Sequence, residues 1–296
     1  MSQVDEIKEL DALVSLMDEP NEEMFVEIRQ KVLSYGKLAL PLLEEAWVNT
    51  MGEDDSDRIE GVIDEIQQNG LVDEFKSWIR ESDGNIIEGL MIITKYYHPE
   101  FDKDYYLERF DKLFRETWLE LNDNLTALEK IKVINHVIYH VYSFTSDLSG
   151  VVGSDTYFIN KVLDTKKGNS LSIGIIYIAI AQKLGIPIFG VGLPSHFILG
   201  YMNDFIDLQL PHFYNEDDVL FYLNPSNSGA IFTHKEISHY LIQANIESDS
   251  RYFLPCSNKA VMKRLIDELI VSFEKDNRHS KTLALIRLQT ILDTSR

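Results

Sequence analysis

Three polar residues in the second half of the chain have the types expected of an acyl-transfer site. Ser170 stands at the start of an apolar helical segment, His196 leads an apolar strand, and Asn224 begins a turn. A nucleophile at a helix N-terminus faces unpaired N–H groups and the positive end of the helix dipole, which stabilise an anion. A histidine on an adjacent strand can take its proton, and a third polar group can orient the ring. The three residues therefore predict a nucleophile, a base and an orienting group.

Each of these residues also has a purely structural interpretation. Ser170 or Ser172 can cap the helix or pack as a buried hydroxyl. Asn224 opens the stretch Asn-Pro-Ser-Asn-Ser-Gly, which is a turn by composition. Serine with asparagine is also an unfavourable mixture, because a serine triad loses roughly 10⁴ in turnover when its aspartate becomes asparagine.

A carboxylate at Asp207 is the alternative orienting group. If Met202 and Asn203 form a two-residue turn, Asp207 lies opposite Ile198 and diagonal to His196. That placement would give a serine–histidine site the acid that Asn224 does not provide.

The elements that would hold these residues are a helix and a set of short strands. The segment from Ser170 to Leu184 predicts a helix, which Gly185 ends and Pro187 prevents from resuming. The apolar period then changes to two, which predicts strands over residues 188–193, 195–201, 205–208 and 219–223. Capping boxes at Thr126/Glu129 and Thr233/Glu236 begin two of the remaining helices, and these are predicted over residues 126–144, 154–168, 233–243, 259–274 and 280–292. A helix followed by an antiparallel sheet indicates an α+β fold.

Residues 1–124 are predicted to be all-helical and strongly acidic. Apolar residues recur there with helical spacing, over residues 7–17, 25–33, 38–47, 57–67, 71–79, 85–97 and 105–121, with Asn69-Gly70 read as a break. This part carries 31 acidic against 12 basic residues, a net charge of −19 out of −20 for the chain. Such a field repels nucleic acid and anionic lipid and attracts a basic protein partner, although it can also serve solubility alone.

Several classes of site are excluded or disfavoured by composition. The single cysteine, Cys256, rules out an intramolecular disulfide and a multi-cysteine metal site. His136 and His140 share a helix face without a third ligand, so they are interpreted as packed or surface residues. No apolar run reaches the ~20 residues of a membrane span, and the acidic N-terminus lacks a signal-peptide pattern. We expect a cytoplasmic protein without metal or cofactor that binds neither nucleic acid nor membrane.

Four motifs resemble the SirB-type transglutaminase-like family of bacterial proteins. They are Lys167-Gly168-Asn169-Ser170-Leu171-Ser172, Tyr177-Ile178-Ala179-Ile180-Ala181, Leu184-Gly185-Ile186-Pro187 and Gly190-Val191-Gly192-Leu193-Pro194-Ser195-His196-Phe197. Upstream, Asn135 and Asn160 fit the same pattern. The resemblance implies a papain-like transglutaminase core over residues 125–245 and a tetratricopeptide-like helical tail over 246–296. Within residues 1–124, the segment from Leu13 to Trp47 resembles about one HEAT-type helical repeat, especially at Glu27-Ile28-Arg29 and Leu38-Ala39-Leu40-Pro41-Leu42-Leu43; an ordinary helical subdomain is the alternative.

Enzymes of this kind use cysteine, histidine and aspartate. The resemblance places these three stations on Ser170, His196 and Asn224, so two of the three residue types are changed. Three hypotheses follow. The favoured one is a catalytically silent transglutaminase-like domain that acts in protein–protein interaction or regulation. One alternative is an acyl-transfer or amide-hydrolysing enzyme that uses Ser170 or Ser172 with His196 and with Asn224 or Asp207 as the orienting group. The other is a helical scaffold whose function lies in residues 1–124.

Overall fold

The computed structural model describes residues 3–50, 52–81, 84–146, 153–194, 196–203, 215–278 and 281–294. The chain divides into two compact units, Met1–Glu74 and Phe75–Arg296. The boundary predicted at residue 124 falls inside the second unit, and the three-part division of the chain stays a prediction.

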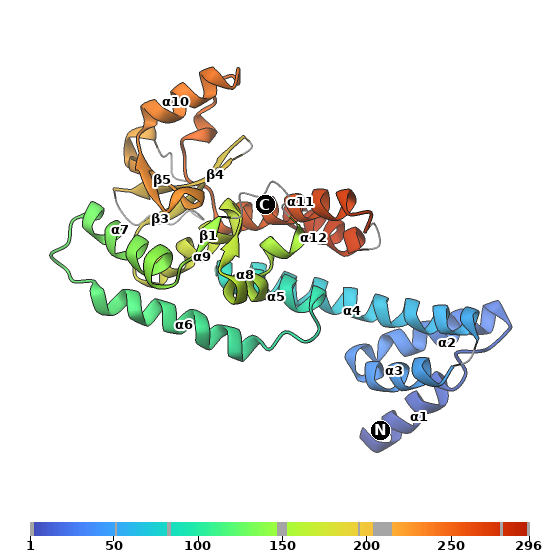
Figure 1. Cartoon of the computed structure of the whole chain (residues 1–296). Helices are drawn as coiled ribbons and strands as arrows, with labels where there is room; N and C mark the ends of the chain where they lie inside the picture. Colours follow the sequence, from blue (N-terminus) through green and yellow to red (C-terminus); the bar gives the residue numbers. More distant parts are fainter. Residues whose placement is uncertain are drawn as a thin grey trace. The chain divides into compact units, whose positions relative to one another are not determined.

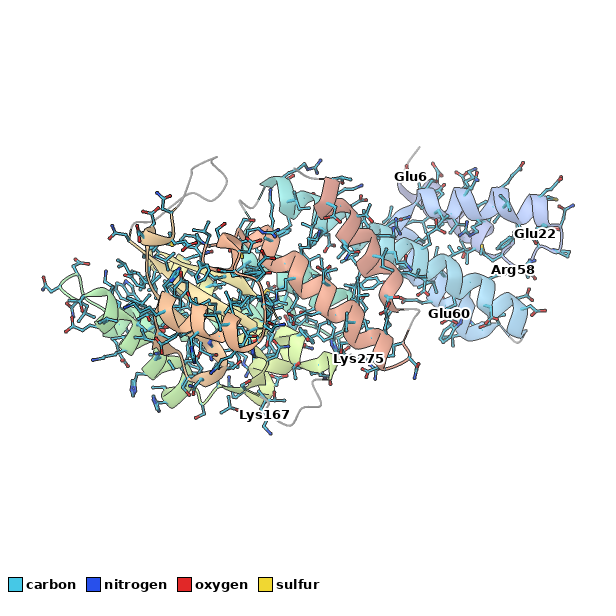
Figure 2. The ribbon with its side chains drawn as sticks, turned by 90° about the horizontal axis from the view of Figure 1, so that it is seen from above. Glu6, Glu22, Arg58, Glu60, Lys167 and Lys275 are labelled. Carbon is cyan, nitrogen blue, oxygen red and sulfur yellow. The ribbon has the colours of Figure 1, made fainter. Side chains whose placement is uncertain are left out.

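The first unit consists of helices packed on one apolar core. Its elements are α1 (Gln3–Val14), α2 (Glu22–Ser34), the 3₁₀ turn η1 (Gly36–Ala39), α3 (Leu40–Asn49) and the first part of α4 (Glu53–Glu81). Asn21 caps α2, and Pro41 occupies the first turn of α3, where its missing N–H is not needed. Four of the unit's five basic side chains form ion pairs with acids of the same unit: Arg29–Glu65, Lys31–Glu9, Lys37–Glu74 and Arg58–Glu22. Figure 2 shows the last pair, with Arg58 of α4 beside Glu22 of α2.

The helix break predicted at Asn69-Gly70 is wrong, because α4 runs through both residues. A Cβ at position 70 would lie 2.9 Å from Lys37 Cε, so glycine serves close packing there. Lys37 continues past it to an ion pair with Glu74. Glycine in a helix interior is about 1 kcal/mol less favourable than alanine, and the tertiary packing of the flanking turns offsets this cost.

The second unit begins with helices that lead to the predicted nucleophile. They are α5 (Ile86–Tyr97), α6 (Lys103–Glu120), α7 (Ala127–Asn135), the π-helix η2 (His136–Val141), the 3₁₀ turn η3 (Ser154–Tyr157), α8 (Ile159–Thr165) and α9 (Ser170–Lys183). The capping box of Thr126 and Glu129 is present at the start of α7. The single helix predicted over 154–168 is wrong. Lys166 adopts a left-handed conformation that ends α8, and strand β2 (Lys167–Gly168) follows, paired in parallel with β1 (Thr145–Ser146).

A four-stranded antiparallel sheet follows α9, as the α+β prediction requires. Its strands are β3 (Ile188–Leu193), β4 (His196–Met202), β5 (Val219–Asn224) and β6 (Ala230–Phe232), in that spatial order. The turns η4 (Glu216–Asp218), η5 (Pro225–Asn227) and η6 (Ser250–Tyr252) flank them. The chain closes with α10 (His234–Gln243), α11 (Asn258–Lys275) and α12 (Thr282–Thr294). In the described part of the chain, no helix is long and apolar enough to cross a membrane.

The two faces of this sheet carry different helices, with α9 on one and α10 on the other (Figure 1). Phe197 of β4 points to α9, where a Cβ at Gly174 would lie 2.7 Å from the Phe197 ring. Ile198 points the other way and packs with Val191, Ile237 and Leu241. This alternation places neighbouring side chains at the start of β4 on opposite faces of the sheet.

We predict that Gly174→Ala destabilises the second unit by about 1–3 kcal/mol, because the added methyl group must displace the buried Phe197 ring. Urea unfolding followed by tryptophan fluorescence measures the change. Gly61→Ala in α4 is the matched control: nothing lies within 4 Å of its Cβ position, so it stabilises the first unit by up to about 1 kcal/mol. Equal and favourable effects at both positions would contradict the close packing of α9 on β4.

Candidate functional site

A pocket of about 460 Å³ opens where the N-terminus of α9, the ends of β4 and β5, and the start of α10 meet. Ser170, His196 and Asn224 all line it, so the structure brings together the three residues selected from the sequence. The remaining lining residues are Ser146, Leu193, Phe197, Ile198, Ser226, Phe232, Glu236, Ile237 and Tyr240. The pocket therefore has an apolar wall and a rim of hydroxyl, amide, imidazole and carboxylate groups.

Ser170 is the first residue of α9 and is half-buried. The helix is capped by its neighbours instead: Asn169 Oδ1 accepts the N–H of Ser172 at 2.8 Å, and Ser172 Oγ accepts the N–H of Asn169 at 3.0 Å. Ser172 is 1 % exposed. The capping interpretation thus applies to Ser172. Ser170 takes no part in the cap and lines the pocket.

His196 begins β4 with an exposed side chain. It is paired with Leu193 across the β3–β4 ladder and lies two residues before Ile198, so its ring belongs to the face that carries α10. The ring meets the edge of Tyr240 with centroids 5.2 Å apart. Tyr240 is itself held by a hydrogen bond from its hydroxyl to Pro194 O at 3.1 Å. The imidazole therefore contacts α10, while α9 packs against the other face of the same strand.

Asn224 ends β5, and its side chain stabilises the following turn. Its Oδ1 accepts the N–H of Ser226 at 3.0 Å. Two further hydrogen bonds hold this turn in place. Asn135 Nδ2 donates to Gly229 O at 3.0 Å, and the Tyr139 hydroxyl donates to Pro225 O at 3.1 Å. The turn interpretation of Asn224 is therefore seen directly.

The buried phenol of Tyr177 completes this anchor by donating to Asn135 Oδ1 at 2.9 Å. Burial raises the pKa of Tyr177 far above its ordinary value, which keeps the phenol a donor. Gly229 sits against Asn135 so closely that a Cβ there would overlap the amide. The position of the turn that carries Asn224 is thus set by side chains from α7 and α9.

No hydrogen bond joins Ser170, His196 and Asn224 to one another within the described ranges. Asp207, the alternative orienting group, lies outside the described residues. The residue opposite Ile198 on β3 is Val191, and β5 flanks β4 on its other edge. The two-residue hairpin after Met202 that would set Asp207 opposite Ile198 is therefore not part of the described sheet.

Comparison with known proteins supports the assignment of this fold. The family profile described as transglutaminase-like superfamily matches residues 104–267, more than half of the chain. The chain belongs to the transglutaminase-like superfamily. Curated relatives include UPF0162 proteins from Vibrio cholerae, 25 % identical over 38 % of this chain and 42 % of the relative, and Xylella fastidiosa, 20 % identical over 64 % of each. The UPF0162 protein YchA of Escherichia coli is 22 % identical over 65 % of this chain and 68 % of its own length.

The matches thus span between about two fifths and two thirds of these relatives. No solved structure matches the chain significantly.

This transglutaminase-like domain has its only thiol away from the pocket. Cys256 donates its Sγ hydrogen to Gly190 O at 3.1 Å, and its backbone N–H donates to the same oxygen at 2.8 Å. Burial raises the pKa of Cys256 to about 12, so the thiol stays protonated and unreactive at neutral pH. Cys256 therefore bonds to β3 and is not among the residues that line the pocket.

The sequence reasoning missed one acid of the pocket. Glu236 was used only as a capping-box residue, and that role is present: its Oε2 accepts the N–H of Thr233 at 2.7 Å and the Thr233 hydroxyl at 3.1 Å. The available signal was the spacing of Glu236 and Tyr240, four residues apart and so on one face of α10. Among the described residues that line the pocket, Glu236 is the sole carboxylate.

Metal ligation receives no support from the described residues, where no group of three or more His, Cys, Asp or Glu side chains gathers. His136 and His140 are both exposed, with ring centroids 5.8 Å apart in the π-helix. The absence of a metal or cofactor stays a prediction.

We predict that Asn135→Ala destabilises the second unit by about 2–3 kcal/mol, because the Tyr177 hydroxyl is left buried without its acceptor. Urea unfolding of Asn135→Ala, Tyr177→Phe and the double variant forms a double-mutant cycle. We expect the double variant to be less destabilised than the sum of the two single variants. Strict additivity would contradict the coupling of the two residues.

Proposed function

We propose that this protein is a catalytically silent transglutaminase-like protein that uses its pocket to bind a partner protein, in an interaction or regulatory role. The single observation that carries the proposal is a pocket lined by all three predicted station residues, Ser170, His196 and Asn224, which no hydrogen bond joins to one another in the described part of the chain.

The residue types support this conclusion. A serine needs a base to remove its proton and an acid to hold that base, because a hydroxyl is a weak nucleophile without activation. Here the Asn224 amide oxygen is engaged with the Ser226 N–H, and the imidazole contacts Tyr240. A cysteine would tolerate asparagine as the orienting group, but a serine does not.

The expected partner is a basic protein. Four of the five basic side chains of the first unit are neutralised by ion pairs within it, while the unit carries 20 acidic residues. The resulting negative field favours encounter with a positively charged surface. The SirB-type assignment, the HEAT-like and tetratricopeptide-like character of the flanking helices, and a cytoplasmic location belong to the same proposal.

A hydrolytic or acyl-transfer function of Ser170 and His196 is the alternative, and their placement in one pocket favours it. A helical scaffold whose function lies in residues 1–124 is the third possibility.

We predict that a fluorophosphonate probe does not modify Ser170 at pH 8, because the hydroxyl has no base bonded to it. Intact-mass spectrometry and peptide mapping measure the adduct, with a serine hydrolase in the same mixture as positive control. An adduct that maps to Ser170 and disappears in Ser170→Ala would overturn catalytic silence and support the enzyme alternative.

We predict that the thiol of Ser170→Cys reacts with iodoacetamide with the same pH profile in the presence and absence of His196. The start of α9 lowers the pKa of a thiol by itself, so the informative comparison is Ser170→Cys against Ser170→Cys/His196→Ala between pH 5 and 9. Cys256, whose burial raises its pKa to about 12, gives little background. A rate that stays high at pH 5–6 only while His196 is present would reveal a thiolate–imidazolium pair and an assembled site.

A further inference from the structure

The described lining of the pocket carries a carboxylate, that of Glu236, and no cationic Lys or Arg side chain. Arg264 approaches from α11, but it donates to Leu193 O at 3.1 Å and is paired with Glu268 at 2.8 Å. The carboxylate of Glu236 thus has no cationic partner on the inner surface of the pocket.

The geometry of Glu236 leaves one of its oxygens available. Oε2 accepts both hydrogen bonds from Thr233 that cap α10, and Oε1 has no partner among the residues described. The cap fixes the side chain at the first turn of α10, one turn before Tyr240. A ligand that enters the pocket therefore meets a positioned carboxylate oxygen and does not have to order it.

The rest of the lining suits a flat, multiply donating group on an apolar stem. Leu193, Ile198 and Ile237 form an apolar wall, and Phe232 and Tyr240 add aromatic rings. The hydroxyls of Ser146, Ser170 and Ser226 supply further acceptors around the rim. A guanidinium combines five donors, a planar shape that stacks on aromatic rings, and weak hydration, whereas an ammonium offers three donors and holds its water more strongly.

The start of α9 adds a complementary donor surface. The N–H groups of Ser172 and Ile173 are satisfied by Asn169, which leaves those of Ser170 and Leu171 without partners in the described part of the chain. These donors match a peptide carbonyl, which any residue within a polypeptide carries next to its side chain. A volume of about 460 Å³ accommodates a side chain together with its flanking peptide groups.

We infer that the pocket receives an arginine side chain of a partner protein, with the guanidinium at Glu236 Oε1 and a flanking carbonyl at the start of α9. The inference rests on the proposed binding function and specifies its ligand. It accords with the acidic first unit, which favours the approach of an arginine-bearing basic surface.

The test uses the full chain and three small probes: N-acetyl-arginine methylamide, the lysine analogue, and the citrulline analogue, which is the neutral isostere of arginine. Binding is followed by the ¹H–¹⁵N spectrum of the intact protein at fixed pH and salt. We expect the arginine probe to bind about fivefold more tightly than the citrulline probe, the difference that a solvent-accessible ion pair supports, and to shift resonances of the pocket. The lysine probe is expected to bind more weakly than the arginine probe.

Glu236→Gln is the decisive variant, because glutamine at this position preserves the capping box while removing the charge. We expect the preference for arginine over citrulline to disappear in Glu236→Gln and to persist in Glu274→Gln, which removes the same charge from an exposed position of α11. Equal binding of arginine and citrulline to the unaltered protein, or an unchanged preference in Glu236→Gln, overturns the inference. Lysine binding as tight as arginine overturns the guanidinium assignment.

The result of the arginine-probe experiment does not depend on whether the protein is catalytically silent. Modification of Ser170 by the phosphonate probe would refute silence whatever the arginine probe does. A failure of the arginine probe with Ser170 unmodified would remove only the ligand assignment.

Discussion

The close contact between Gly174 and Phe197 is the constraint on which the arrangement of the site depends. Because position 174 has no side chain, α9 approaches β4 closely enough to receive the Phe197 ring, which also lies against Gly190 of β3. Phe197 is thereby committed to the α9 face of the sheet. Strand alternation then commits its neighbour His196 to the opposite face, where α10 lies. One packing contact in the core decides the direction of the residue that would act as a base.

That constraint explains why the three stations share a pocket without forming a relay. Ser170 reaches the pocket from the start of α9, His196 from the α10 side of β4, and Asn224 from a turn anchored by Asn135. Each side chain is held by a different element, and each is satisfied locally or faces the cavity. The fold therefore brings the three residues to one cavity without bonding them to one another in the described part of the chain.

The sequence predicted the local features well where a signal is contained in a few neighbouring residues. The strand over 188–193, the helix from Ser170 and the capping boxes at Thr126 and Thr233 are all confirmed. The wrong predictions concern positions whose local structure depends on residues distant in the sequence. Nothing next to Gly70 reveals that Lys37 packs on it, and nothing next to Lys166 reveals that β2 pairs with β1. Ser170, His196 and Asn224 could be selected because each lies in a short local motif, whereas Glu236 enters the pocket only through the placement of α10.

Glu236 bears on the proposal that the pocket is catalytically silent. Because Asn224 is uncharged, the pocket would carry no carboxylate among its described lining residues if α10 did not contribute Glu236. The α10 cap uses Oε2 of this carboxylate and leaves Oε1 available for a ligand. A negative charge at the rim, with no Lys or Arg in the described lining, lowers affinity for anions and favours a cationic ligand. In a catalytic triad, a carboxylate would instead stabilise the imidazolium of the histidine. In the proposed function, this cavity therefore holds a basic side chain of a partner protein and does not activate Ser170.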